Sequence, residues 1–109
     1  MMEVIIMDQK IITLCGSTRF KETFYKVAEN LTKNGYIVLY PSCYDRSDDE
    51  DKDLKELLCK THRKMIDMSD AIYVINKDGY IGESTKSEID YAIQHNKEVI
   101  YFVDILKIN

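Results

Sequence analysis

Four short apolar runs, rich in isoleucine and valine, divide the chain and predict β-strands. The apolar residues in these runs are nearly continuous rather than alternating, which is typical of strands buried on both faces of a sheet. The runs span residues 10–15, 36–40, 71–76 and 98–103. A further apolar run at residues 3–7 is separated from the first strand by Asp8 and Gln9, so residues 1–9 are interpreted as an N-terminal extension or an extra edge strand.

The segments between these runs carry apolar residues at spacings of three and four, which predicts amphipathic α-helices. The expected helices cover residues 20–31, residues 54–68 and a segment that begins near Thr85. Because strands alternate with helices, we expect an α/β fold, a doubly wound parallel sheet of the Rossmann or flavodoxin type with strand order 2-1-3-4. At 109 residues the chain is expected to form a single domain, residues 10–109.

A doubly wound sheet forms a ligand crevice at the carboxyl ends of the two strands where the winding direction reverses. For the order 2-1-3-4 these are the first and third strands. The segments that follow them are residues 16–19 and 79–88. The topology therefore predicts that these two segments lie together, although they are far apart in the chain.

The first of these segments, Gly16-Ser17-Thr18-Arg19, joins a strand to a helix. Free backbone N–H groups at such a junction, with two hydroxyls and a guanidinium, are suited to binding a phosphate or another anion. The structural alternative is an ordinary turn in which Ser17 or Thr18 caps the helix. Neither residue is followed three positions later by Glu or Gln, so no capping box competes for the site.

The second segment is a glycine-hinged loop between the third strand and the third helix. Its glycines allow backbone turns closed to other residues, its hydroxyls can bind an anion or a sugar, and its tyrosine can stack on a base. The residues expected to contact a ligand here are Gly79, Tyr80, Gly82, Ser84 and Thr85.

Glu88 follows this loop and has two interpretations. The functional one is a carboxylate beside the crevice that acts on the anomeric carbon of a sugar, where developing positive charge favours an adjacent anion or covalent capture. The structural one is a capping box, in which Glu88 folds back onto the backbone N–H of Thr85. The two are compatible, because a cap would also fix the position of the side chain.

His62 is expected on the apolar face of the second helix, where a histidine is commonly a core or rim residue. Its functional interpretation is substrate contact or proton transfer near neutral pH. His95 is the only other histidine, so the two are not expected to form a metal site. The acidic run at residues 45–53 is followed by Leu54 where a calcium loop requires glycine. We therefore expect neither a metal nor a cofactor.

The overall charge and the cysteines narrow the range of partners. With a formal net charge of -4 and no basic cluster, the chain is not expected to bind a nucleic-acid polymer or an anionic membrane. A small anionic molecule needs only one local positive site and is compatible with this charge. The three cysteines lack Cys-x-x-Cys spacing, and the N-terminus lacks the basic segment of a signal peptide, which together favour a cytoplasmic location.

Four motifs, in their order and spacing, carry a likeness to a known family. They are residues 15–19, 69–74, 82–92 and 96–100. Together they resemble the nucleoside 2-deoxyribosyltransferase superfamily, especially its relatives the 2'-deoxynucleoside 5'-phosphate N-hydrolases. The resemblance implies that Glu88 attacks C1' of a nucleoside or nucleotide, and that Ser17, Arg19 and Ser84 hold the 5'-phosphate. It also implies a homodimer or larger homo-oligomer, with a neighbouring subunit completing the site.

The chain departs from that family's pattern at three positions. Thr13 stands where the family has a tyrosine that orients the nucleophile, His62 lies near the position of an aspartate that assists the leaving base, and Asp90 replaces a glycine. His62 is a candidate to replace that acid by protonating the base. We therefore expect an N-glycosidase or deoxyribosyltransferase. The alternatives are a non-catalytic nucleotide-binding or sensing module and, more weakly, a structural subunit with an empty crevice.

Overall fold

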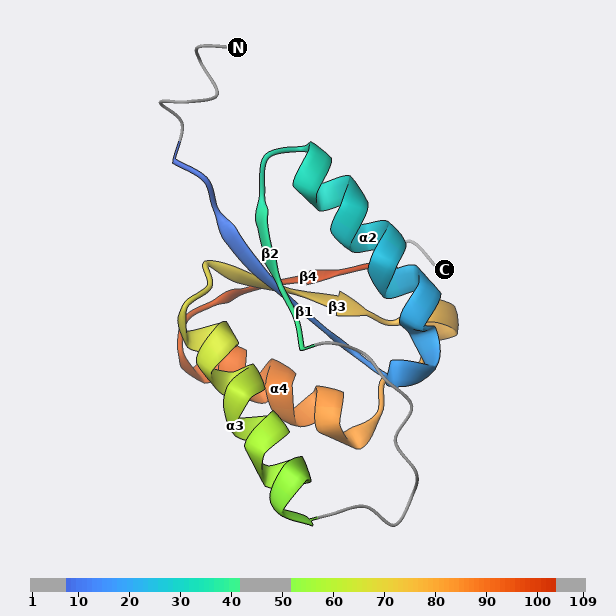
Figure 1. Cartoon of the computed structure of the whole chain (residues 1–109), viewed down its shortest axis with the longest axis vertical. Helices are drawn as coiled ribbons and strands as arrows, with labels where there is room; N and C mark the ends of the chain where they lie inside the picture. Colours follow the sequence, from blue (N-terminus) through green and yellow to red (C-terminus); the bar gives the residue numbers. More distant parts are fainter. Residues whose placement is uncertain (1–7, 42–51, 104–109) are drawn as a thin grey trace.

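The sheet is parallel and has the predicted strand order. The computed structural model describes residues 8–41 and 52–103, and Figure 1 shows its sheet between layers of helix. The four strands are β1 (Ile11–Gly16), β2 (Ile37–Leu39), β3 (Ala71–Ile75) and β4 (Glu98–Tyr101). They pair in the order β2-β1-β3-β4, which confirms the doubly wound α/β prediction and the order 2-1-3-4.

Helices cover both faces of this sheet (Figure 1). Helix α2 (Lys21–Lys33) packs on one face, and helices α3 (Lys52–Asp67) and α4 (Glu83–Gln94) pack on the other. Two short 3₁₀ helices, η1 (Thr18–Phe20) and η2 (Lys77–Gly79), follow β1 and β3. Helix η1 begins within the first of the two segments that the topology predicted to meet, and η2 ends at Gly79, where the second segment begins.

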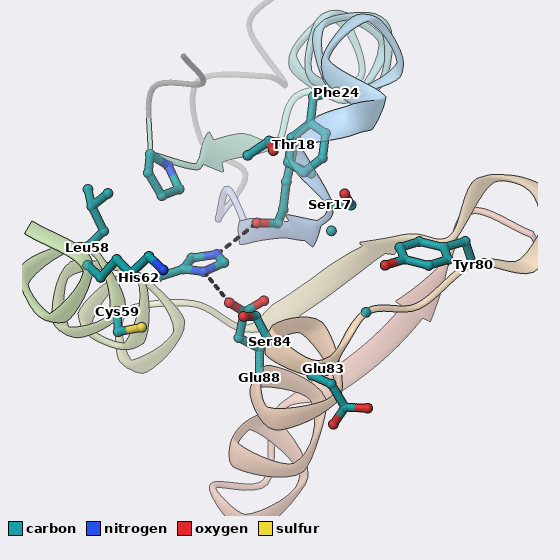
Figure 2. A pocket seen from close by; sticks show the side chains of 15 residues that line it. Ser17, Thr18, Phe24, Leu58, Cys59, His62, Tyr80, Glu83, Ser84 and Glu88 are labelled. Carbon is teal, nitrogen blue, oxygen red and sulfur yellow. Dashed lines mark hydrogen bonds and ion pairs between the residues drawn. The ribbon is translucent and has the colours of Figure 1, made fainter. Parts of the chain in front are cut away.

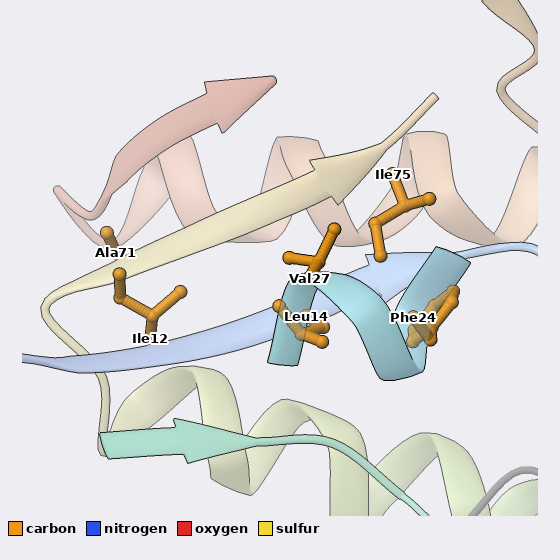
Figure 3. Close-up of a cluster of buried hydrophobic side chains, with 6 residues drawn as sticks. All are labelled: Ile12, Leu14, Phe24, Val27, Ala71 and Ile75. Atoms are coloured by element: carbon orange, nitrogen blue, oxygen red, sulfur yellow. The ribbon is translucent and has the colours of Figure 1, made fainter. Parts of the chain in front are cut away.

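Alternating side chains of the strands build a separate apolar core on each face. Toward α2, the buried cluster consists of Ile12, Leu14, Phe24, Val27, Ala71 and Ile75 (Figure 3). Toward α3 and α4, it consists of Cys15, Ile66, Ile72, Val74, Ile89 and Ala92. Because the side chains of Leu14 and Cys15 point to opposite faces, the end of β1 is anchored on both sides and its last residues are held in place.

Helix α4 begins earlier than the apolar pattern predicted, at Glu83 rather than near Thr85. Its N-cap is Gly82, so Thr85 lies inside the first turn, where its side chain is buried, and Glu88 lies in the second turn. The capping box that was the structural interpretation of Glu88 does not fit this geometry, because Thr85 is not the N-cap. The Ser-Thr pair imitates a helix start in the sequence, whereas the backbone turns into the helix at the glycine.

Two expectations fall outside the described residues. Residues 1–7, which decide between an N-terminal extension and an edge strand, are not described, and neither are residues 45–51 of the acidic run. Across the residues that are described, no helix has the length and apolar character needed to span a membrane.

Candidate functional site

A cavity of about 470 Å³ opens where the segments after β1 and β3 come together, as the topology predicted. Its walls include the turn after β1, the loop before α4 with the first turns of that helix, and one face of α3 (Figure 2). Phe24 of α2 and Pro41 also line it. Of the predicted site residues, those that line the cavity are Gly16, Ser17, Thr18, His62, Tyr80, Gly82, Ser84 and Glu88. The fold thus gathers most of the predicted site around one space.

Glu88 reaches this cavity from the second turn of α4, and only one of its carboxylate oxygens has a hydrogen-bond partner in the described part of the chain. Its Oε2 lies 2.9 Å from Nδ1 of His62. Its Oε1 is buried and has no hydrogen-bond partner among the described residues. A buried acceptor without a partner is costly, so Oε1 is the atom of this site most in need of a ligand.

His62 lies between Glu88 and strand β1, and both of its ring nitrogens are engaged (Figure 2). Nε2 lies 2.9 Å from the carbonyl oxygen of Leu14, which can only accept, so Nε2 carries a proton and donates it. Nδ1 faces the carboxylate of Glu88, so the second ring proton is shared with that group. These contacts fix the orientation of the imidazole and, through it, the orientation of Glu88.

The pKa of His62 is raised from its ordinary value of 6.5. Burial alone acts against the charged ring, but the hydrogen bond and negative charge of Glu88, together with the Leu14 carbonyl, outweigh it. The raised pKa favours the form of the pair in which an imidazolium is held against a carboxylate. With side-chain exposures of 11% for His62 and 19% for Glu88, this ion pair is largely shielded from water.

Cys15 is the third member of this cluster, with Sγ 3.7 Å from Nε2 of His62. The sequence of thiol, imidazole and carboxylate has the connectivity of a hydrolytic triad. However, the thiol is fully buried and does not line the cavity. Burial, followed by the charge and hydrogen bond of Glu88, raises the thiol pKa well above its usual value. A nucleophilic role for this thiol is thereby disfavoured, because the thiolate is the reactive form.

Thr13, which stands where the resemblance described above would place a tyrosine, makes its contacts elsewhere in the fold. Ser69 donates a hydrogen bond to the backbone oxygen of Met65, at 2.8 Å, and its hydroxyl lies 2.6 Å from that of Thr13. All three groups join β1 to the end of α3. Thr13 is fully buried in this connection and does not reach Glu88, whose positioning contact comes from His62 instead.

The turn after β1 has the capped geometry that was given as the structural alternative. Ser17 is the N-cap of η1 and accepts a hydrogen bond of 3.2 Å from the backbone N–H of Arg19. The Arg19 guanidinium lies over the ring of Tyr80, 4.0 Å from its centroid. This cation–π contact joins the two loops. Arg19 itself does not line the cavity, and its predicted contact with an anion stays a prediction.

Two other predicted residues, Gly79 and Thr85, also lie outside the cavity lining. Gly79 has a φ of +77°, which favours glycine, and it serves the turn that leads to Tyr80. Gly82 has a closer constraint, because a Cβ added there would lie 3.2 Å from the Tyr80 hydroxyl. The glycines of this loop therefore shape the wall of the cavity through the backbone.

Comparison with known proteins places the chain in a family. Residues 13–101 match the family described as a domain of unknown function, DUF4406. The chain belongs to this family. The matched range runs from β1 to the end of β4 and includes His62 and Glu88, so the DUF4406 domain contains the cavity and its buried cluster. No curated protein matched the chain.

One wall of the cavity in this DUF4406 domain contains residues that the sequence pattern did not identify as site residues. Lys55, Leu58 and Cys59 line the space together with His62 from α3. These residues are spaced by three, one and three positions, so they share one face of the helix. Once His62 had been chosen as a site residue, this periodicity was the signal that could have identified the others.

Proposed function

We propose that this protein breaks the N-glycosidic bond of a nucleoside or nucleotide, or exchanges its base, through a covalent intermediate on Glu88. The proposed activity is that of a 2'-deoxynucleoside 5'-monophosphate N-hydrolase or a nucleoside deoxyribosyltransferase. One observation carries the proposal. Glu88 lines a cavity with one oxygen, Oε2, held by His62, while the other, Oε1, has no partner among the described residues.

The chemistry assigned to Glu88 follows from the place of its carboxylate at the cavity. The carboxylate attacks C1' of the sugar, the bond between C1' and the base nitrogen breaks, and its electron pair leaves with the base. The resulting glycosyl ester is then resolved by water, which gives hydrolysis, or by a second base, which gives transfer. A carboxylate near C1' also stabilises the positive charge that develops on the sugar ring in both steps.

His62 is assigned the positioning of Glu88 in this reaction. Its N–H groups face the Leu14 carbonyl and the Glu88 carboxylate, so neither is directed toward a departing base in the present arrangement. The imidazole holds Oε2 and thereby fixes the carboxylate at the cavity, which is the kind of preorganisation that a covalent step requires. We therefore favour positioning over the base protonation expected from the sequence.

The polar groups of the cavity support a phosphorylated ligand. Ser17, Thr18, Ser84 and Lys55 all line it. The N-cap of α4 is Gly82, which has no side chain to satisfy the first N–H groups of the helix, and these groups attract anions. We assign this end of the cavity to the 5'-phosphate.

The apolar side chains of the cavity support the base and sugar of the same ligand. Phe24, Leu58 and Tyr80 supply ring and aliphatic surface on its walls. Aromatic rings of this kind stack on bases with little dependence on the base identity. The volume of about 470 Å³ lies within the usual range of small-molecule sites. A nucleotide monophosphate is therefore the ligand that we propose, with a homo-oligomer as the working form suggested by the family resemblance.

A panel of ribo- and deoxyribonucleosides, with and without a 5'-phosphate, tests this proposal. The protein is incubated at high concentration with each compound, and free base is quantified by chromatography. Release of base from at least one 2'-deoxynucleoside or its 5'-monophosphate is the expected result. If no compound releases base above the rate seen without protein, the proposed reaction is withdrawn.

A non-catalytic nucleotide-binding or sensing module is the second candidate, and a specific observation favours it. Thr13 is committed to Ser69, and both nitrogens of His62 have protein partners, so neither is free to assist a departing base in this arrangement. Titration calorimetry with the same panel distinguishes the two functions. Tight binding of an intact nucleotide without release of base would establish the sensing function.

A further inference from the structure

Cys15, His62 and Glu88 bring a sulfur, a nitrogen and an oxygen together on the inner side of the cavity. Each residue comes from a different element: β1, α3 and α4. One ligand atom from each lies within 4.8 Å of the other two. The proposed glycosidic reaction uses the carboxylate and the imidazole but has no role for the thiol, whose close approach is left unexplained.

The histidine has the hydrogen bond that is usual for a metal ligand. A metal-binding imidazole commonly donates its other N–H to a carboxylate or a backbone carbonyl, which fixes the ring. Here Nε2 donates to the Leu14 oxygen at 2.9 Å, which leaves Nδ1 on the side of Glu88. Oε1 of Glu88, buried and without a partner among the described residues, is a further unused donor atom.

From this arrangement we propose that the cluster binds one Zn²⁺ ion through Cys15 Sγ, His62 Nδ1 and the Glu88 carboxylate. A mixed sulfur, nitrogen and oxygen donor set suits zinc better than magnesium or calcium, which prefer oxygen alone. Because His62 and Glu88 line the cavity, the fourth position of a tetrahedral ion faces it and is filled by water or a ligand.

Binding replaces protons that the cluster now holds. The thiol gives up its proton to become a thiolate ligand, and the imidazolium gives up the Nδ1 proton that it shares with Glu88. Up to two protons are therefore released for each Zn²⁺ bound.

Zinc binding has a consequence that rests on the proposed function. An ion bound by the Glu88 carboxylate occupies the group that would attack the sugar, so Zn²⁺ and a glycosyl group exclude each other. The ion would act as an inhibitor, and Cys15 would be the residue that confers this sensitivity without taking part in the reaction.

The test uses the full chain and metal salts alone. Zn²⁺ is titrated calorimetrically in two buffers of different ionisation enthalpy, which counts the protons released. Co²⁺ is titrated in parallel, because it gives a charge-transfer absorption band when a thiolate binds it. We expect one ion per chain, more than one proton released per ion at neutral pH, and a Co²⁺–thiolate band.

Two variants identify the thiol that binds. Cys15→Ala should lose the band and weaken Zn²⁺ binding at least about tenfold, the lower bound known for disturbing even an indirect partner of a metal site. The matched control is the double variant Cys43→Ala/Cys59→Ala, which removes the other two cysteines and should bind Zn²⁺ like the unaltered chain. Circular dichroism verifies that each variant is folded.

Several results would overturn the metal site. These are no binding by the unaltered chain, undiminished binding by Cys15→Ala, or loss of the Co²⁺ band in the double variant. If Cys15→Ala does not fold, the band in the double variant decides alone, because Cys15 is then the only cysteine. If no zinc site is found, the proposal of base release still stands. If no base is released, the metal stoichiometry and the Co²⁺ band still test the zinc site.

Discussion

Replacing His62 by alanine removes the partner that holds the Glu88 carboxylate in a largely buried position. The side chains are 11% and 19% exposed and 2.9 Å apart, so the contact is shielded from most of the screening that weakens surface ion pairs. The same substitution removes the donor to the Leu14 carbonyl. Removing one partner of a buried pair typically lowers the free energy of unfolding by about 3–5 kcal/mol. Because both side chains keep some exposure, we expect a loss of about 3 kcal/mol here.

The assay is urea and thermal unfolding at neutral pH, followed by circular dichroism. For a chain of this size each kcal/mol shifts Tm by about 4–8 °C, so His62→Ala should lower Tm by roughly 12 °C or more. His95→Ala is the matched control, because His95 is the only other histidine and is exposed. Its contacts are a stack on Tyr91 and a hydrogen bond to the Tyr91 carbonyl, and its loss should cost about 1 kcal/mol or less.

A double-mutant cycle separates the pair from ordinary packing. Once Glu88 has become alanine no carboxylate is left without a partner, so adding His62→Ala should cost at least about 1 kcal/mol less than it does alone. Additive costs of the two substitutions, or a cost for His62→Ala no larger than that of His95→Ala, would refute the description of a buried ion pair.

Three further outcomes follow from the same geometry. In the base-release assay, Glu88→Ala should abolish activity, whereas Ser17→Ala should chiefly raise KM for phosphorylated substrates; equal loss with unphosphorylated ones would argue against a phosphate contact. The pKa of His62 is raised on folding, so its stabilising contribution is complete below about pH 6.5 and is lost as the pH rises through the folded-state value. The free energy of unfolding should therefore fall over that window in the unaltered chain and not in His62→Ala. Gly16→Ala should destabilise the fold by about 1–3 kcal/mol in urea unfolding, because its Cβ would lie 3.0 Å from the Ile75 carbonyl oxygen; an unchanged midpoint would show that β1 and β3 can separate.

The arrangement of the fold could be predicted because it depends on repeated, local signals. Continuous apolar runs and helical spacings each involve many residues, so an error at one position does not change the strand order. The meeting of the Gly16 and Gly82 segments followed from that order alone. The first residue of a helix is harder to predict. The N-cap of α4 is Gly82, whereas Thr85 and Glu88 have the sequence pattern of a capping box.

The contacts within the site could not be predicted, because they depend on how helices are placed across the sheet. Whether the His62 ring faces Glu88, Leu14 or solvent is decided by the rotation of α3 against β1 and α4, which no local pattern encodes. The burial of Cys15 on the same face is a property of the strand register. Arg19 was predicted to contact an anion, but its guanidinium stacks on Tyr80 and the residue does not line the cavity.

The most direct test of the account is to locate the sugar on the protein during turnover. The chain is mixed with a 2'-deoxynucleoside 5'-monophosphate whose base it releases, quenched in acid, digested and analysed by mass spectrometry. We predict that deoxyribose 5-phosphate is attached through C1' to the Glu88 carboxylate. The peptide from Glu88→Ala should not carry this adduct. Base release that continues undiminished in Glu88→Ala, or a sugar attached to a different side chain, would contradict the role assigned to this carboxylate.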